Sequence, residues 1–214
     1  FAYGSISPTN RRFGSYAEYI CLPEDWSIAL KPTNISHNEA AATPYGGLLA
    51  MHLLNKTSIQ KGDEVLIYGA SGSIGTMAVQ LAKIAGANVT AVCSGKNFDL
   101  VKSLGCDRVI DYTLQGTEKQ LSTYKFVLDA VGNSKSSILK DKSKKALTEN
   151  GKYISIDTGV PKTPKSAFIQ LKNYLAAGKI KPVIDKVFPL EKIAEAHDYV
   201  ELGHKRGNVV IETF

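Results

Sequence analysis

The sequence predicts an α/β fold in which a doubly wound parallel sheet carries helices on both faces. Two observations predict it. Short runs rich in valine and isoleucine alternate along the chain with segments whose apolar residues follow the helical period. A glycine-rich turn also joins one such run to a helix, and the next run closes a strand-helix-strand unit of about thirty residues, the size expected for a parallel crossover.

The strand predicted at Val65 to Tyr68 breaks into a turn with glycines at 69, 72 and 75, and a helical pattern follows from position 74. This G-x-x-G-x-x-G spacing differs from the dinucleotide fingerprint only in the place of its first glycine. Glycines let backbone N–H groups approach a pyrophosphate, and the helix N-terminus faces that anion with a partial positive charge. We therefore predict that a dinucleotide is bound by Gly69, Ser71, Gly72, Ser73, Ile74 and Gly75.

The remaining elements follow in the same alternation. Further strands are predicted at Asn88 to Ser94, Arg108 to Tyr112, Phe126 to Gly132 and Lys152 to Ile156. Helices are predicted at Phe98 to Leu104 and, rich in lysine, at Ser137 to Leu147, with a turn at Glu149 to Gly151 before the last strand.

The chain also carries linked motifs in a fixed order. They are GSYAEYICLPED, AAATPYGGLLAMHLL, GDEVLIYGASGSIGTMAVQLAKIAGANVTAVCS and LVKSLGCDRVIDY, then LDAVG, GKYISI, AAGKIKPVID and EAHDYVELGHKRGNVVI. In these motifs the chain resembles the medium-chain dehydrogenase/reductase superfamily, and within it the zinc-independent quinone oxidoreductase-like members. The resemblance covers nearly the whole chain and implies a Rossmann-type sheet with a partial β-rich, GroES-like catalytic domain.

The resemblance implies three parts. Residues 1–33 are expected to be a remnant of the catalytic domain, 34–184 the dinucleotide-binding Rossmann domain, and 185–214 the return to the catalytic domain. Phe13 to Leu22 resembles a strand of that domain, and the tail is expected to form a helix at Leu190 to Leu202 and a strand at Asn208 to Glu212. Most of the catalytic domain is expected to be missing.

The end of the second strand predicts the cofactor. An NAD-type site has Asp or Glu there, about twenty residues after the glycines, whereas this chain has Ser94, Lys96 and Asn97. A carboxylate would repel the 2′-phosphate of NADPH, but Ser94 and Asn97 can donate hydrogen bonds to it and Lys96 adds a positive charge. NADPH is therefore predicted, with a solvated loop lysine as the alternative for Lys96.

The resemblance adds cofactor-binding residues that the motif spacing does not supply. Tyr112 matches a tyrosine beside the adenine end, and the other implied contacts are Ala130, Val131, Gly132 and Asn208. Asp129 precedes three of them, where the family passes close to the nicotinamide ribose, but its carboxylate can equally cap the following turn. No catalytic residue is named, because the substrate side belongs mainly to the missing domain.

Composition excludes several function classes. No apolar run approaches the roughly eighteen residues of a membrane span, and no signal-peptide pattern opens the chain, so a cytoplasmic protein is predicted. The three cysteines, Cys21, Cys93 and Cys106, are far apart and predict neither disulfides nor a metal site. In the family, a zinc ligand begins the helix matched by residues 40–45, where this chain has none.

The net charge of +6 attracts polyphosphates non-specifically, but no aromatic residues are interleaved among the lysines of the predicted basic helix. We interpret that helix as a solvated face, and binding to nucleic acid stays a minor alternative. The lysines are Lys135, Lys140, Lys142, Lys144 and Lys145.

The prediction is a zinc-free, NADPH-dependent oxidoreductase that transfers a hydride to a quinone, an enone or another small carbonyl compound. The alternative is a non-catalytic cofactor-binding fragment or pseudoenzyme, with weak RNA binding. In several family members a sixth strand lies at the sheet edge and pairs across a homodimer. Here only residues 157–167 lie between the fifth strand and the segment that begins at Phe168, and two prolines make a central strand there unfavourable, which puts the dimer in doubt.

Overall fold

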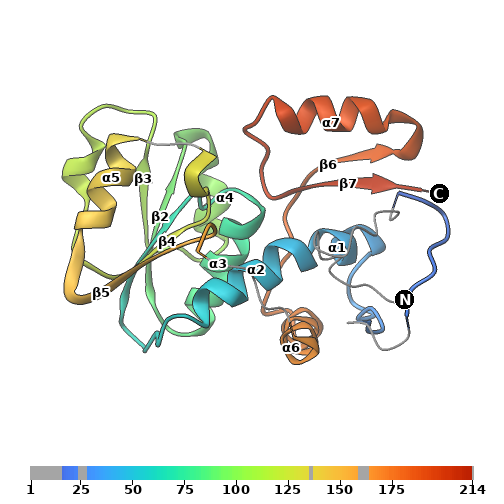
Figure 1. The fold of residues 1–214 in the computed structure, drawn as a ribbon, viewed down its shortest axis with the longest axis horizontal. Helices are drawn as coiled ribbons and strands as arrows, with labels where there is room; N and C mark the ends of the chain where they lie inside the picture. The colour runs from blue at the N-terminus through green and yellow to red at the C-terminus, as the bar shows by residue number, and fades with distance from the viewer. Residues whose placement is uncertain (1–15, 24–27, 135–136, 159–163, 214) are drawn as a thin grey trace.

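The computed structural model describes residues 16–23, 28–134, 137–158 and 164–213. They form two parts (Figure 1): a five-stranded sheet with helices on both faces, and a smaller two-stranded sheet that carries one helix.

The larger sheet is parallel throughout. Its strands, in the order β3-β2-β1-β4-β5, are β1 (Glu64–Tyr68), β2 (Asn88–Cys93), β3 (Arg108–Asp111), β4 (Tyr124–Asp129) and β5 (Leu147–Ser155). The chain winds outward from β1 to β3 and then returns to β4 on the other side of β1. This confirms the doubly wound sheet and places its switch point between β1 and β4, where such sheets bind ligands.

Helices cover both faces. They are α1 (His37–Ala42), α2 (Pro44–Leu54), α3 (Ser73–Ile84), α4 (Phe98–Ser103), α5 (Ile138–Lys145), α6 (Lys165–Ala176) and α7 (Ile193–Glu201). Along β1, Val65 and Ile67 point into the core beneath α2 and α3, while Leu66 and Tyr68 point into a second cluster with Leu139 of α5. Because both faces are buried, the strand is a continuous apolar run, as its sequence indicated.

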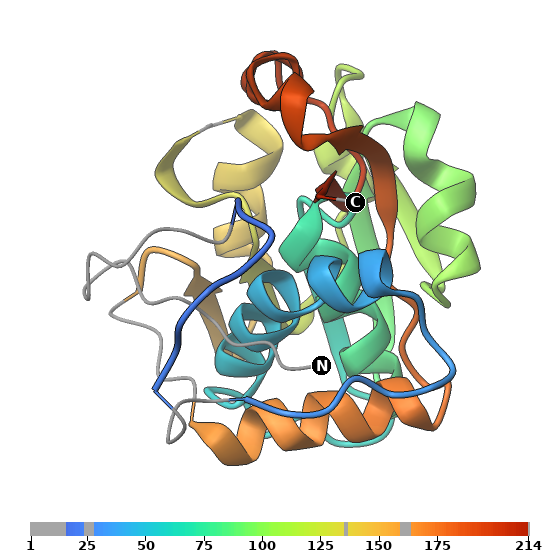
Figure 2. The same ribbon diagram turned by 90° about the vertical axis from the view of Figure 1, so that its right-hand side faces the viewer.

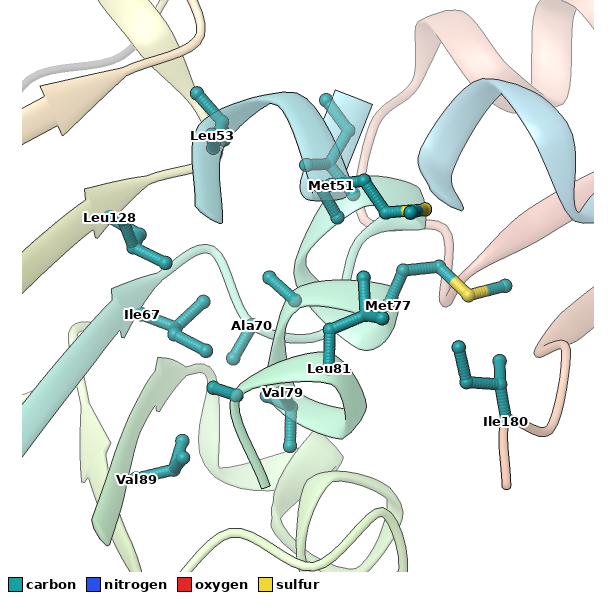
Figure 3. Close-up of a cluster of buried hydrophobic side chains, with 14 of the residues drawn as sticks. Met51, Leu53, Ile67, Ala70, Met77, Val79, Leu81, Val89, Leu128 and Ile180 are labelled. Atoms are coloured by element: carbon teal, nitrogen blue, oxygen red, sulfur yellow. The ribbon is translucent and has the colours of Figure 1, made fainter. Parts of the chain in front are cut away.

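Helices α2, α3 and α6 stack on one another beside the sheet (Figures 1 and 2). Figure 3 shows side chains of α2 and α3 meeting those of the sheet in the larger core, with Met51, Met77 and Ile67 among them. Two glycines of α2 allow this close stacking. A Cβ at Gly46 would lie 2.5 Å from the Ser73 carbonyl oxygen at the start of α3, and one at Gly47 would lie 2.6 Å from Leu171 of α6.

The β4–β5 region differs from the prediction in two ways. Strand β4 ends at Asp129, before Ala130, and β5 begins at Leu147 and runs through the predicted turn at residues 149–151. Tyr124 pairs with Leu147 but Phe126 pairs with Lys152, so the extra residues of β5 bulge out of the ladder. Residues 149–151 predicted a turn from their own sequence alone, whereas the strand at Leu147 depends on its pairing with Tyr124 of β4.

The predicted strand at residues 13–22 is wrong in its described part. Residues 16–22 are neither strand nor helix, and Tyr19 is 89% exposed. A strand needs a pairing partner, and no described strand offers one here. Residues 13–15 lie outside the described part of the chain.

The tail forms the smaller sheet, in which β6 (Ile184–Pro189) pairs in parallel with β7 (Asn208–Glu212), and α7 connects the two. The tail helix and strand are thus confirmed. Between β5 and α6 the described residues contain no strand, so β5 is the edge of the larger sheet as described. The domain boundaries and the dimer remain predictions.

Candidate cofactor-binding cleft

A cleft of about 440 Å³ opens at the carboxyl ends of the parallel strands, beside the switch point. The strand ends and the loops after them form one wall, and the segment between α7 and β7 forms the other. The lining residues are Tyr68, Gly69, Ser71, Gly72, Cys93, Tyr112, Ala130, Val131, Ser137, Val200, Gly203, His204 and Lys205.

The turn after β1 is held by the backbone. Gly69 has a left-handed φ of 81°, and the N–H groups of Gly69 and Ala70 both donate to the Val92 carbonyl of β2 at 3.0 Å. Gly72 is the N-cap of α3, and no side chain caps this helix. The first-turn N–H groups of α3 have no acceptor within the helix, so they can bind an anion.

The three glycines have different roles. A Cβ at Gly69 would lie 2.4 Å from Val131 Cγ2, and a Cβ at Gly75 would lie 2.1 Å from the Gly69 carbonyl oxygen. Both positions are therefore required by packing. A Cβ at Gly72 would meet only the Gly69 oxygen, at 3.6 Å. A Cβ at Gly72 would therefore not collide with the start of α3, and we expect a side chain there to meet a dinucleotide bound in the cleft.

Three predicted residues of this turn, Ser73, Ile74 and Gly75, are not among the residues that line the cleft. Ile74 is 7% exposed and belongs to the larger core, and Gly75 packs inward against the turn. Any contact from Ile74 to a ligand would come from its backbone at the start of α3. Ser73 Oγ donates to Asn208 Oδ1 at 2.5 Å, so both side chains tie the tail to this helix.

At the end of β2, Ser94 and Asn97 are buried and bonded to the turn. Asn97 Nδ2 donates to Ser71 Oγ and to Ser94 Oγ, each at 3.1 Å, while Asn97 Oδ1 is buried without a partner among the described residues. Lys96 lies between them, exposed, in a 3₁₀ turn over Gly95–Asn97. Of the three predicted 2′-phosphate residues, Lys96 is therefore the one with an accessible side chain.

The sequence missed a carboxylate at this end of the site. Asp111, at the end of β3, accepts from the Gly95 N–H at 2.8 Å and from the Thr113 N–H and hydroxyl at 2.8 and 2.7 Å. Burial raises the pKa of Asp111, but the hydrogen bonds from Thr113 and Gly95 outweigh burial and lower it. The Gly95 N–H is thus used within the protein.

At the end of β4 the structure decides the role of Asp129. Its carboxylate is buried, and Oδ1 accepts from the N–H groups of Val131 and Gly132 at 3.0 and 3.1 Å. Asp129 therefore caps the turn that lines the cleft. Gly132 itself is buried and does not line the cleft.

The second oxygen of Asp129 lies 2.8 Å from Lys140 Nζ and accepts from the Tyr153 hydroxyl at 2.7 Å. Lys140 is only 4% exposed, so the prediction of a solvated lysine is wrong at this position. Its ammonium also donates to the Gly132 carbonyl. Burial and the bond to Asp129 both raise the pKa of Tyr153.

Tyr68 and Tyr112 form the middle of the wall. Tyr112 lines the cleft as predicted, with its ring centroid 6.4 Å from that of Tyr68. The Tyr68 and Ser137 hydroxyls are hydrogen-bonded at 2.7 Å. The sequence did not select Tyr68 or Cys93, although both stand at strand carboxyl ends, where the fold rule could have found them.

The tail docks directly on the glycine turn. The Gly207 N–H donates to the Ser71 carbonyl at 2.8 Å, and Gly207 forms an isolated bridge with Gly72. Asn208 also donates to the Val183 carbonyl. Lys205 and His204 of the same segment line the cleft, and no sequence signal joined them to the distant turn.

Two further findings concern metals and membranes. The described residues contain no group of three or more His, Cys, Asp or Glu side chains that could hold a metal ion. Cys93 lines the cleft, and burial raises the pKa of its thiol to about 12. Among the helices described, none combines the length and apolar character needed to cross a membrane.

An open parallel sheet with a glycine turn and an uncapped helix at its switch point defines a dinucleotide-binding α/β protein. Two family profiles described as zinc-binding dehydrogenase match residues 73–180 and 158–211. The chain belongs to the medium-chain dehydrogenase/reductase superfamily, among its quinone oxidoreductase-like members.

Its relatives include an NADPH-dependent alkenal/one oxidoreductase, chloroplastic, from Arabidopsis thaliana, which is 36% identical over 94% of this chain and 53% of that protein. A chloroplast envelope quinone oxidoreductase homolog from the same plant is 34% identical over 93% of this chain and 69% of that protein. Among solved structures, the quinone oxidoreductase from Coxiella burnetii has a TM-score of 0.83 and 27% identity, covering 94% of this chain and 68% of that one. The chain thus spans about half to two thirds of its relatives' lengths.

Proposed function

We propose that this chain binds NADPH in the cleft and belongs to an oxidoreductase that reduces a quinone, an enone or another small carbonyl compound. The observation that carries the proposal is the uncapped start of α3, with Gly72 open toward the cleft at the switch point of the sheet. When bound, the cofactor would supply the hydride.

The residues present fit such a ligand. The first-turn N–H groups of α3 would hold the diphosphate, since that helix end carries a partial positive charge and no competing side chain. Tyr112 would flank the adenosine, and Ala130 and Val131 would form the wall beside the nicotinamide, with their turn held by Asp129.

Preference for NADPH over NADH would rest mainly on Lys96. Ser94 and Asn97 are engaged with each other and with the glycine turn, so they position the loop that carries Lys96. Lys96 is exposed on that loop and would supply the positive charge that a 2′-phosphate needs. No carboxylate stands at the end of β2, where an NAD-type site would place one.

We also propose that this chain binds no zinc, since residues 40–45 lack the ligand that begins the matching helix in zinc-dependent relatives. Protein purified without chelator should contain far less than one zinc per chain by elemental analysis. Stoichiometric zinc that survives dialysis would contradict this. The cytoplasmic location is a prediction from sequence only, and the names of relatives include chloroplastic and mitochondrial proteins.

A second candidate is a cofactor-binding protein without turnover. The openness of the cleft favours it, because within the described part of the chain its second wall comes from the tail, and residues 16–22 are not a strand. A closed active site would exclude water, whereas an open one would let water enter. Weak RNA binding gains no support, since the buried Lys140 removes one charge from the predicted basic face.

Two measurements test these proposals. NADPH fluorescence titration of the chain should show saturable binding, and absence of binding would refute the proposed function. NADPH oxidation should then be followed with a panel of quinones, enals and aldehydes. Oxidation of NADPH with any of them supports the reductase, whereas saturable binding with no turnover supports the second candidate.

A further inference from the structure

The charge of the cleft is concentrated in one residue. Among the described residues that line it, Lys205 is the one with a permanently charged side chain, and no aspartate or glutamate lies in the wall. The other lining residues are apolar, glycine, hydroxyl-bearing or cysteine, apart from His204. A cleft with a cation and no carboxylate suits an anionic ligand.

Lys205 is attached to the glycine turn through the backbone. Its Nζ donates to the Gly207 carbonyl at 2.7 Å, and the N–H of the same Gly207 donates to Ser71 at 2.8 Å. The segment between α7 and β7 lies on the side of the smaller sheet that faces the larger one (Figure 1), and Lys205 of this segment lines the cleft. The ammonium is thus held on the residue that bridges to Gly72, the N-cap of α3.

Lys205 is partly buried, and the described residues that line the cleft include no carboxylate to pair with its ammonium. Burial lowers the pKa of Lys205, and the negative charge of Asp185 opposes this. Asp185 is already bonded to the Tyr199 hydroxyl at 2.7 Å and to Arg206 at 3.1 Å. One of the three ammonium donors is used by Gly207, which leaves two for other acceptors.

We propose that Lys205 binds the diphosphate of the dinucleotide, as a cation that the tail supplies opposite the uncapped start of α3. The inference rests on the proposed function and names a ligand residue for it. It separates the two lysines of the site by the phosphate each one contacts. Lys96 is assigned to the 2′-phosphate, which only NADPH has, and Lys205 to the diphosphate, which NADPH and NADH share.

The test is a Lys205→Met variant of the full chain, titrated with NADPH and with NADH by fluorescence. Loss of a hydrogen bond to a charged group should weaken both cofactors equally, by about ten- to a hundredfold. Lys205→Arg, which keeps the cation, should bind nearly as the parent does. Lys192→Met removes an exposed lysine elsewhere in the tail and should leave both affinities unchanged.

Two fragments distinguish the phosphates. ADP-ribose contains the diphosphate and 2′-AMP contains the 2′-phosphate, so Lys205→Met should weaken the first and spare the second. Unchanged affinity for NADPH, NADH and ADP-ribose, or a loss confined to NADPH and 2′-AMP, would overturn the assignment. The thermal unfolding midpoint is measured for each variant, and Lys205→Gln serves as a second neutral replacement. If the parent chain binds neither dinucleotide, the proposed function falls with the assignment, whereas a failure confined to Lys205 leaves that function standing.

Discussion

The loops after β1 and β4 both line the cleft, but they keep their shapes by opposite means. The β1 loop is built from glycines and backbone hydrogen bonds, and the N–H groups at the start of α3 are left without a side-chain cap. In the β4 loop, the N–H groups of Val131 and Gly132 are both taken by Asp129, which is itself paired with Lys140.

This difference separates a binding loop from a supporting loop. A helix start without a cap offers donors that an anion can use, whereas a capped turn has already used its donors within the protein. The β1 loop should therefore determine the affinity for a dinucleotide, and the β4 loop should determine the stability of the wall. The predictions for Lys140, Gly72 and Gly75 test this comparison directly, and those for Lys96 and Asp185 extend it to other parts of the chain.

The largest effect is expected at the supporting loop. Lys140→Met should lower the free energy of unfolding by about 3–5 kcal/mol, because Asp129 would remain as a buried charge without its partner. Urea denaturation measures the change. Adding Asp129→Asn should recover part of the loss, since the amide oxygen can still cap the turn, and equal stability of the single and double variants would contradict the ion-pair explanation.

The next effect is expected at the binding loop. Gly72→Val should weaken NADPH at least about a hundredfold, or about 2.7 kcal/mol, while the unfolding midpoint stays near that of the parent. The backbone of Gly72 is extended and a Cβ there would meet only the Gly69 carbonyl oxygen, at 3.6 Å, so we expect the main effect of the side chain to fall on the ligand. NADPH titration and thermal unfolding measure the two quantities.

Gly75→Ala is the matched control for that variant. Its Cβ would lie 2.1 Å from the Gly69 carbonyl oxygen, so it should destabilise the fold by about 1–3 kcal/mol. If Gly72→Val also lowers the unfolding midpoint, or binds NADPH normally, the distinction between the two glycines is wrong.

A smaller and more selective effect is expected at Lys96. Lys96→Ala should weaken NADPH by about tenfold to a hundredfold and leave NADH nearly unchanged, because only NADPH carries the 2′-phosphate. Titration of both cofactors into both proteins measures the selectivity. Equal affinities in the parent chain, or equal losses in the variant, would show that Lys96 is a solvated loop lysine.

The smallest effect is expected on the stability of the folded state at acidic pH. Burial raises the pKa of Asp185, but the bonds from Tyr199 and Arg206 outweigh it and hold the pKa below its usual range. The carboxylate therefore stabilises the folded state above the ordinary Asp pKa of about 3.9, and this contribution is lost as the pH falls through the lower, folded-state pKa. Asp185→Asn should lose less stability than the parent between about pH 7 and about pH 3 in denaturation experiments.

Sequence prediction failed where one strand depends on another. The turn signal at Glu149 to Gly151 was sound as local chemistry, but those residues bulge within β5 because Leu147 pairs with Tyr124. Residues 16–22 have the composition of a strand, yet no described strand pairs with them. A propensity describes one segment, whereas a strand exists only with its partner.

The sequence by itself determined β1, the glycine turn and α3, because apolar period and glycine spacing are local and act within a few residues. The alternation of such strands with helices also indicated a doubly wound parallel sheet. Only the tertiary structure decided that Lys140 is buried against Asp129 and that Lys205 lines the cleft beside Gly72. The sequence does not distinguish a lysine on a solvated face from a lysine in a buried ion pair. Its surroundings are set by the packing of α5 on β4 and of the tail on the turn, contacts between segments that are far apart in the chain.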